Sequence, residues 1–129
     1  MCIRDRRLMT QKRIHVVDAR ILVMGLTFKE NCPDLRNTRV VDIVDGFKSL
    51  HAQVDVHDPW VDADEAWAEY RIRTTGEPRE GAYDAIILAV PHRQFIEWGA
   101  ERIRQFGKPE HVLCDVKYLF AKEATDTRL

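Results

Sequence analysis

The chain has 129 residues, with 20 lysine and arginine residues against 21 aspartate and glutamate residues, for a formal net charge of −1. This length predicts one domain with its own core, and the balanced charge argues against nucleic-acid binding, which usually leaves a strongly basic surface. The three cysteines are odd in number and lack C-x-x-C spacing, and no apolar run reaches the roughly 18 residues of a membrane span. We therefore expect a cytoplasmic protein without a membrane segment.

The segment 21–39 combines a strand with a charged loop. Residues 21–24 form a short apolar run closed by Gly25, which is typical of a buried parallel strand that ends in a functional loop. Phe28 and Lys29 follow in that loop. Because ligands of open α/β sheets bind beyond the carboxyl ends of the strands, the basic residues of this loop predict an anionic ligand that carries phosphate.

The loop does not have the glycines of a dinucleotide-binding turn. That turn needs G-x-G-x-x-G so that the backbone approaches a pyrophosphate closely. This loop has only Gly25, and it places Phe28 and Lys29 where small residues would be required. We therefore expect side chains, and not the backbone, to recognise the ligand.

The elements that follow alternate between helix and strand. Residues 40–50 carry apolar side chains at helical spacing, and residues 52–57 alternate apolar and polar side chains before a turn at Asp58-Pro59. Residues 83–90 are the most apolar run and predict a central parallel strand. The expected topology is a βαβ unit with the usual right-handed crossover.

The other segments are shorter. Residues 61–70 predict an acidic helix that packs Trp67 and Tyr70 inward, and a brief edge strand is expected over residues 71–74. The loop after residue 90 leads into another helix, which has apolar positions at Ile96, Trp98, Ile103 and Phe106.

A last strand at residues 111–115 leads to Lys117. The order of elements predicts an α/β fold, a three-layer Rossmann-like domain with a mostly parallel sheet of four or five strands and helices on both faces.

Seven residues of the first loop match one family pattern: Gly25, Phe28, Lys29, Asp34, Arg36, Asn37 and Thr38. In this pattern a strand is followed by G-x-x-[FY]-K and then by D-x-R-[NS]-[ST], which opens a helix. On these residues the chain resembles the carboxyl-terminal, UDP-binding domain of the UDP-glucose/GDP-mannose dehydrogenase family. The spelling TFKENCPDLRNT most resembles the branch that acts on UDP-N-acetylglucosamine or UDP-N-acetylgalactosamine in bacterial surface-polysaccharide synthesis.

The resemblance implies domain boundaries. Residues 14–122 would form a nucleotide-sugar (UDP)-binding domain. Residues 1–13 would be a lead-in helix or a foreign leader, and residues 123–129 a tail.

The resemblance also implies roles for four side chains. Phe28 and Lys29 would contact the UDP-sugar, with Lys29 as a point positive charge near phosphate or sugar oxygens, and Lys117 would be a further substrate contact. Arg36 would reach an NAD cofactor held mainly by another domain of the enzyme. Without the family, Lys29 is equally well interpreted as a solvated loop lysine. Arg36 would be a surface residue that pairs with Asp34, and Phe28 would be a core residue.

The family activity is an NAD-dependent, two-step oxidation of the sugar C6 alcohol to the acid. Full-length members contain a G-x-G-x-x-G domain and a catalytic cysteine in a G-x-C motif, and this chain contains neither motif. We therefore assign no catalytic residue and expect this chain to be inactive alone. Its expected partners are a UDP-sugar and the amino-terminal and central parts of the same enzyme, which is expected to be a homo-oligomer.

Three further residues have alternative readings. Asp58 is taken as a turn former in preference to a ribose-binding acid, and Cys32 as a chance loop cysteine in preference to a nucleophile. His92 is a general base or sugar contact on one reading, and a structural or surface histidine on the favoured one. No histidine has metal-ligand spacing, so no metal is expected.

The alternative function for the chain is that of a non-enzymatic Rossmann-like assembly or regulatory module, in which the charged loop is incidental.

Overall fold

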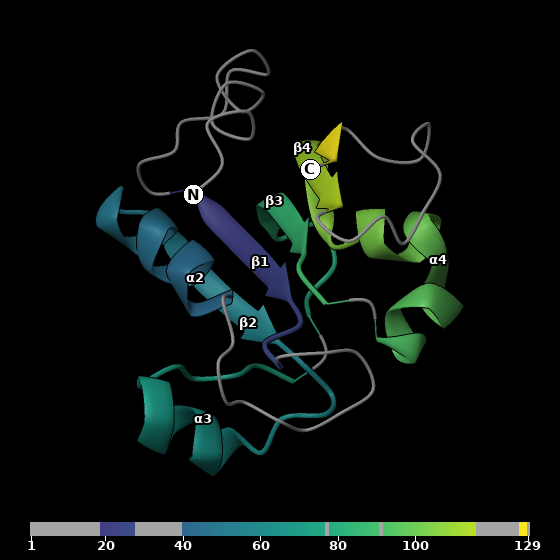
Figure 1. The fold of residues 1–129 in the computed structure, drawn as a ribbon. Coiled ribbons are helices and arrows are strands. Elements are labelled where there is room, and N and C mark those ends of the chain that lie inside the picture. The colour runs from purple at the N-terminus through teal and green to yellow at the C-terminus, as the bar shows by residue number, and fades with distance from the viewer. Residues whose placement is uncertain (1–18, 28–39, 77, 91, 116–126, 129) are drawn as a thin grey trace.

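The computed structural model describes residues 19–27, 40–76, 78–90, 92–115 and 127–128. The described residues form an α/β fold in which a parallel sheet lies between helices (Figure 1). In chain order, its elements are β1 (Arg20–Met24), α2 (Val40–Ser49), β2 (Gln53–His57), α3 (Ala63–Tyr70), β3 (Tyr83–Leu88), α4 (Arg93–Arg104), β4 (Gly107–Asp115) and β5 (Thr127–Arg128).

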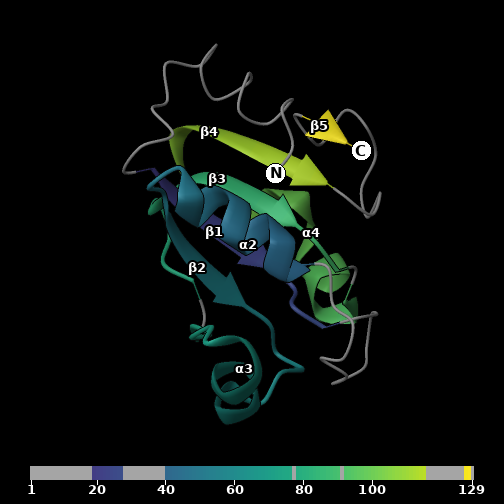
Figure 2. The ribbon, with the colours of Figure 1, turned by 60° about the vertical axis from the view of Figure 1, so that its left-hand side comes forward.

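The sheet has five strands in the order β2-β1-β3-β4-β5, and every pair of neighbours among them is parallel. Figure 2 shows this order, with α2 in front of the sheet and α4 behind it. The connection from β1 to β2 passes through α2, as expected for a βαβ unit. The predicted Rossmann-like fold, with a parallel sheet and helices on both faces, is confirmed.

The central strands are apolar on both faces because a helix covers each face. One core layer joins alternate strand residues to the buried side of α2, and its members include Ile21, Val23, Ala85, Ile87, Val44 and Phe47. The other layer joins the intervening strand residues to α4, and its members include Leu22, Met24, Ile86, Leu88, Phe95 and Ile103. Strands buried on both faces read as continuous apolar runs, which is why the sequence located β1 and β3.

Helix α4 is broken at Gly99, whose backbone is not helical (φ 76°, ψ 163°). Helical spacing therefore does not carry across this residue. Ile96 lies before the break and is 51% exposed, whereas Ile103 lies after it and is fully buried. The helix therefore does not present Ile96 and Ile103 on one buried face.

Helix α3 lies within the predicted range of residues 61–70 but begins only at Ala63, and Trp67 does not pack inward. The Asp62 side chain caps the helix by accepting hydrogen bonds from two backbone N–H groups of the first turn. The buried position of α3 is taken by the small Ala66, and Trp67 is 41% exposed. The guanidinium carbons of Arg71 and Arg73 lie 5.3 and 4.9 Å from the centre of the indole ring, so cations and not the core cover this side chain.

Two strand predictions also need correction. The edge strand expected over residues 71–74 is reduced to one parallel bridge between Val56 and Thr74. Strand β4 begins at Gly107, earlier than the expected His111, because Gly107 already pairs with Tyr83 of β3.

None of the helices in the described ranges is long and apolar enough to cross a membrane.

Candidate functional site

The strands end together at one edge of the sheet. Met24 of β1 is in register with Leu88 of β3, and Leu88 is in register with Asp115 of β4. The segment that carries Phe28 follows β1, and the segment that carries Lys117 follows β4. Both predicted ligand-binding segments therefore leave the sheet from the carboxyl edge, where ligands of such sheets bind.

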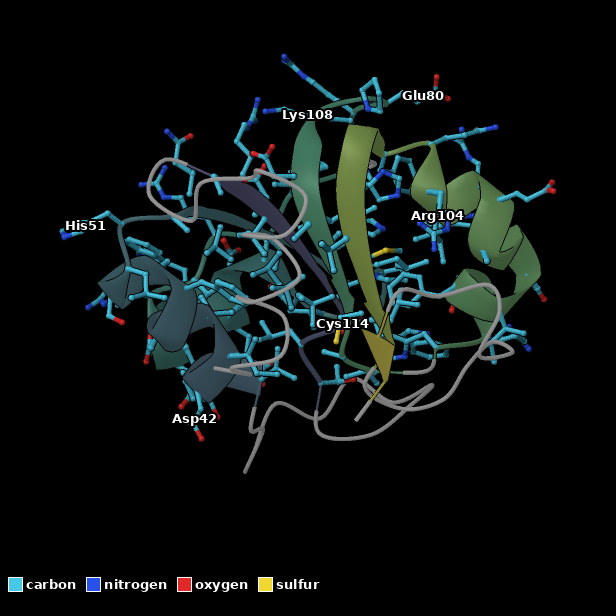
Figure 3. The ribbon with its side chains drawn as sticks, turned by 90° about the horizontal axis from the view of Figure 1, so that it is seen from above. Asp42, His51, Glu80, Arg104, Lys108 and Cys114 are labelled. Atoms are coloured by element: carbon cyan, nitrogen blue, oxygen red, sulfur yellow. The ribbon has the colours of Figure 1, made fainter. Side chains whose placement is uncertain are left out.

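The opposite, amino edge has a different electrostatic character. Figure 3 shows Lys108 and Glu80 where β3 and β4 begin, and Cys114 toward the other end of β4. The Lys108 ammonium lies 3.1 Å from a carboxylate oxygen of Asp84, and the Arg102 guanidinium lies 2.7 Å from that of Glu80. These cations are matched by acids, so the amino edge is not the candidate anion site.

Gly25 is required by packing at the carboxyl edge. Its φ is 102°, and a Cβ on it would lie 2.6 Å from the Cβ and 2.8 Å from the backbone nitrogen of Val90. Its N–H donates to the carbonyl of His57 at 2.8 Å. The space on the Cβ side of this glycine is thus filled by Val90, which follows β3, and a ligand cannot approach the backbone from that side. This geometry supports the expectation of side-chain recognition.

Asp58 joins the ends of β1 and β2. Its Oδ2 accepts hydrogen bonds from the backbone N–H of Leu26 at 2.7 Å and of Thr27 at 3.2 Å. Its Oδ1 accepts one from the backbone N–H of Trp60 at 2.8 Å, which closes the turn after β2. The predicted turn former is confirmed. The ribose-binding alternative is not supported, because Asp58 is buried and its carboxylate faces the protein.

His92 adds the end of β3 to the same network. Its side chain is fully buried, and its Nε2 lies 2.8 Å from Asp58 Oδ2 and 3.2 Å from the hydroxyl of Thr27. Because a carboxylate only accepts, we place a hydrogen on Nε2 that His92 donates to Asp58. The ring is flanked by Trp60 and Phe95, with centroid distances of 6.2 and 5.4 Å. His92 is therefore a structural histidine.

We call Thr27, Asp58, Trp60 and His92 the strand-end cluster. Burial alone would raise the pKa of the Asp58 carboxyl, but the hydrogen bonds from His92 and from the backbone of Leu26 outweigh it and hold that pKa below its usual 3.8. The cluster is thus organised around a buried carboxylate anion. The indole N–H of Trp60 donates to Gln94 at 2.9 Å, which ties the turn after β2 to α4.

The predicted ligand contacts Phe28, Lys29, Arg36 and Lys117 lie outside the described residues, as does Cys32. The structure places the residues from which their segments start, and the positions of these side chains remain predictions. The contact between Asp58 and His92 is not predicted by the sequence. The available signal was that each follows a strand and lies next to a proline, at Asp58-Pro59 and Pro91-His92.

Within the described ranges, no three His, Cys, Asp or Glu side chains are grouped as a metal ion would require. The described part of the carboxyl edge contains the turn at Gly25 and the strand-end cluster. Of this cluster, Thr27 lies directly before the segment that carries Lys29.

Comparison with known proteins identifies relatives over most of the chain. Residues 22–122 match the family described as "UDP-glucose/GDP-mannose dehydrogenase family, UDP binding domain". The chain is 60% identical over 121 residues to UDP-N-acetyl-D-glucosamine 6-dehydrogenase of Pseudomonas aeruginosa, and 50% identical over 121 residues to the enzyme of that name from Salmonella typhi. Each alignment covers 94% of this chain, but this chain spans only 29% and 28% of the two relatives.

Solved structures share the fold. UDP-D-ManNAc dehydrogenase from Pyrococcus horikoshii matches 95% of this chain with a TM-score of 0.75 at 23% identity, and the matched part is 28% of that protein. A UDP-glucose dehydrogenase from Pyrobaculum islandicum matches 95% of this chain with a TM-score of 0.69 at 21% identity, over 27% of that protein.

Proposed function

Because this chain belongs to the UDP-glucose/GDP-mannose dehydrogenase family, through its UDP binding domain, we propose that it binds the uridine diphosphate part of a UDP-sugar. The observation that carries this proposal is the family match over residues 22–122, which includes the whole G-x-x-F-K loop. The relative with 60% identity is a UDP-N-acetyl-D-glucosamine 6-dehydrogenase, so a UDP-N-acetylhexosamine is the proposed sugar nucleotide, with UDP-glucose as the alternative.

The proposed contacts come from the segments that leave the carboxyl edge. Lys29 supplies a positive charge to the phosphates or sugar oxygens, and Phe28 supplies an apolar contact beside it. Lys117, which follows β4, is the second basic contact. A basic residue from each of two segments at one edge suits a ligand with two negatively charged phosphates.

The complete reaction is proposed for the longer enzyme. In it, the C6 alcohol of the bound sugar is oxidised to the acid, and NAD is the electron acceptor. The turn after β1 has no G-x-G-x-x-G sequence, and Val90 fills the space beside Gly25. We therefore assign NAD mainly to a part of the enzyme outside this chain, with Arg36 reaching it. Residues 14–122 would form the UDP-binding unit of a cytoplasmic, homo-oligomeric enzyme of polysaccharide synthesis.

Calorimetric titration of this chain with UDP, UDP-N-acetylglucosamine and NAD tests the proposal. We expect both uridine nucleotides to bind in the millimolar range, with a dissociation constant of about 1 mM, and NAD not to bind measurably. Added salt should weaken the binding, because the main contacts are between charges.

Lys29→Ala should abolish measurable UDP binding, and Lys48→Ala is the matched control. Lys48 is exposed in the last turn of α2, and that helix returns the chain to the amino edge where β2 begins. Loss of binding in both variants would point to nonspecific charge attraction. A folded protein that binds neither uridine nucleotide would contradict the proposal and favour the non-enzymatic assembly or regulatory module.

A further inference from the structure

The residue directly before the proposed ligand-binding loop is held at two points. Thr27 donates its backbone N–H to Asp58 at 3.2 Å, and its hydroxyl lies 3.2 Å from Nε2 of His92. Thr27 is 1% exposed and His92 is fully buried, so water does not compete freely for these hydrogen bonds. Thr27 is joined by a peptide bond to Phe28, which begins the loop with Lys29.

We infer that Asp58 and His92 are positioning residues, which fix Thr27 and thereby aim the UDP-binding loop that starts at Phe28. This inference rests on the proposed function, because it assigns a role to residues that act on Lys29 without touching the ligand. Asp58 follows β2, His92 follows β3 and Thr27 follows β1. The start of the loop is therefore held by contacts with the ends of two neighbouring strands as well as by its own.

The chemistry of the pair is suited to positioning. Two apolar side chains would hold the strand ends together as well, and burying a charge is costly unless it is fully hydrogen-bonded. A carboxylate, however, fixes the direction of the N–H groups that donate hydrogen bonds to it. One oxygen of Asp58 accepts hydrogen bonds from Leu26, Thr27 and His92. The backbone of the two residues before the loop is therefore oriented as well as buried.

The aromatic neighbours keep His92 in place. Phe95 lies edge-on to the imidazole and Trp60 is stacked near it, and Trp60 is itself held through its N–H groups by Asp58 and Gln94. A side chain enclosed in this way does not reach solvent, and within the described residues Thr27 is the contact of His92 that leads directly into the loop. Because Leu26 and Thr27 are already ordered before UDP binds, the loop that follows them loses less conformational entropy on binding.

The test compares UDP affinity in four variants of this chain by calorimetry. Thr27→Val removes the hydroxyl and keeps the shape of a buried side chain, and Thr27→Ser keeps the hydroxyl. His92→Phe removes the donor to Asp58, and His92→Gln retains an N–H donor. We expect Thr27→Val and His92→Phe to weaken UDP binding about tenfold, since a small misplacement of a binding group has effects of that size, and the conservative variants to bind nearly as the parent does.

Tyr83→Phe is the stability control. It removes the hydrogen bond of 2.8 Å from the Tyr83 hydroxyl to Asp55, far from the carboxyl edge, so it should lower the melting temperature without weakening UDP binding. Equal loss of affinity in Tyr83→Phe and Thr27→Val would show a general effect of stability and would overturn the inference. Unchanged affinity in folded Thr27→Val would overturn it too, even if His92→Phe does not fold.

A second readout separates this inference from the proposed function. Amide hydrogen exchange at Leu26 and Thr27 should be faster in Thr27→Val than in the parent, and unchanged in Tyr83→Phe. If the parent does not bind UDP, the proposed function is wrong. Faster exchange in Thr27→Val would then still support the part of the inference that Asp58 and His92 fix Leu26 and Thr27. If exchange at both amides is unchanged, the pair does not fix Thr27 and the inference is wrong.

Discussion

Replacing Asp58 with asparagine tests the strand-end cluster most severely, because the change is nearly isosteric. The carboxylate accepts from Leu26, Thr27 and His92 through one oxygen and from Trp60 through the other. An asparagine has one acceptor oxygen and one donor NH₂ group. In either orientation of the amide, its NH₂ group faces a backbone N–H that is at least half-buried, and the bond from His92 loses its charged acceptor.

The cost follows from these contacts. The less costly orientation keeps the oxygen toward Leu26 and Thr27 and loses the bond from Trp60. The lost hydrogen bond, the unsatisfied half-buried N–H of Trp60 and the weakened bond to His92 together predict a loss of about 2–4 kcal/mol in the free energy of unfolding at pH 7. Urea unfolding followed by circular dichroism measures it. Asp45→Asn on the exposed side of α2 is the control, with an expected change within about 0.5 kcal/mol.

The difference should also depend on pH with a definite sign. The pKa of Asp58 in the folded chain lies below its usual 3.8, so its carboxylate contributes stability above that value and loses it as the pH falls through the lower folded-state pKa. The gap between the parent and Asp58→Asn should therefore be full at pH 6 and shrink in acid below about pH 4. A difference under about 0.5 kcal/mol at pH 7, or one that grows in acid, would refute this reasoning.

Three other substitutions probe separate parts of the fold. Gly25→Ala should destabilise by about 2–5 kcal/mol in urea unfolding, because it combines a positive φ with a clash against the backbone of Val90; a loss under about 1 kcal/mol would contradict the packing. Burial, and then the hydrogen bond to Asp55, raise the pKa of Tyr83 to about 12. In an ultraviolet titration, the Tyr83→Phe variant should therefore lack the tyrosine that ionises near pH 12 in the parent. If the variant instead lacks a tyrosine that ionises near pH 10, the raised pKa is contradicted. The stability contributed by that raised pKa is present below pH 10 and is lost as the pH rises through 12. Trp67→Ala should cost about 1 kcal/mol or less, because the indole packs against two arginines at the surface and not in the core; the cost typical of a buried tryptophan, about 3 kcal/mol or more, would contradict its position.

The strands at the centre of the sheet could be predicted because their surroundings leave a direct trace in the sequence. Both faces of β1 and β3 are covered, and continuous apolar runs are the result. The amphipathic pattern of α2 likewise records one buried face. Where one residue interrupts the pattern, as Gly99 does in α4, the apolar residues predict the helix but not its break.

The polar contacts were less accessible because they depend on strand order. Asp58 and His92 are 34 positions apart in the chain, and they meet only because β2 and β3 both lie beside β1. Trp67 shows a related limit. Helical spacing gives the direction of a side chain, but only the three-dimensional arrangement shows that Ala66 takes the core position and that two arginines cover the indole.

Nuclear magnetic resonance mapping of UDP on the ¹⁵N-labelled chain tests the central claim most directly, because it reports where the nucleotide binds. The account predicts that saturating UDP shifts the amide signals of Gly25, Thr27 and His92 at the carboxyl edge and leaves those of Arg20 and Lys108 at the amino edge unchanged. Shifts confined to the amino edge, or none in the folded chain at saturating UDP, would contradict it.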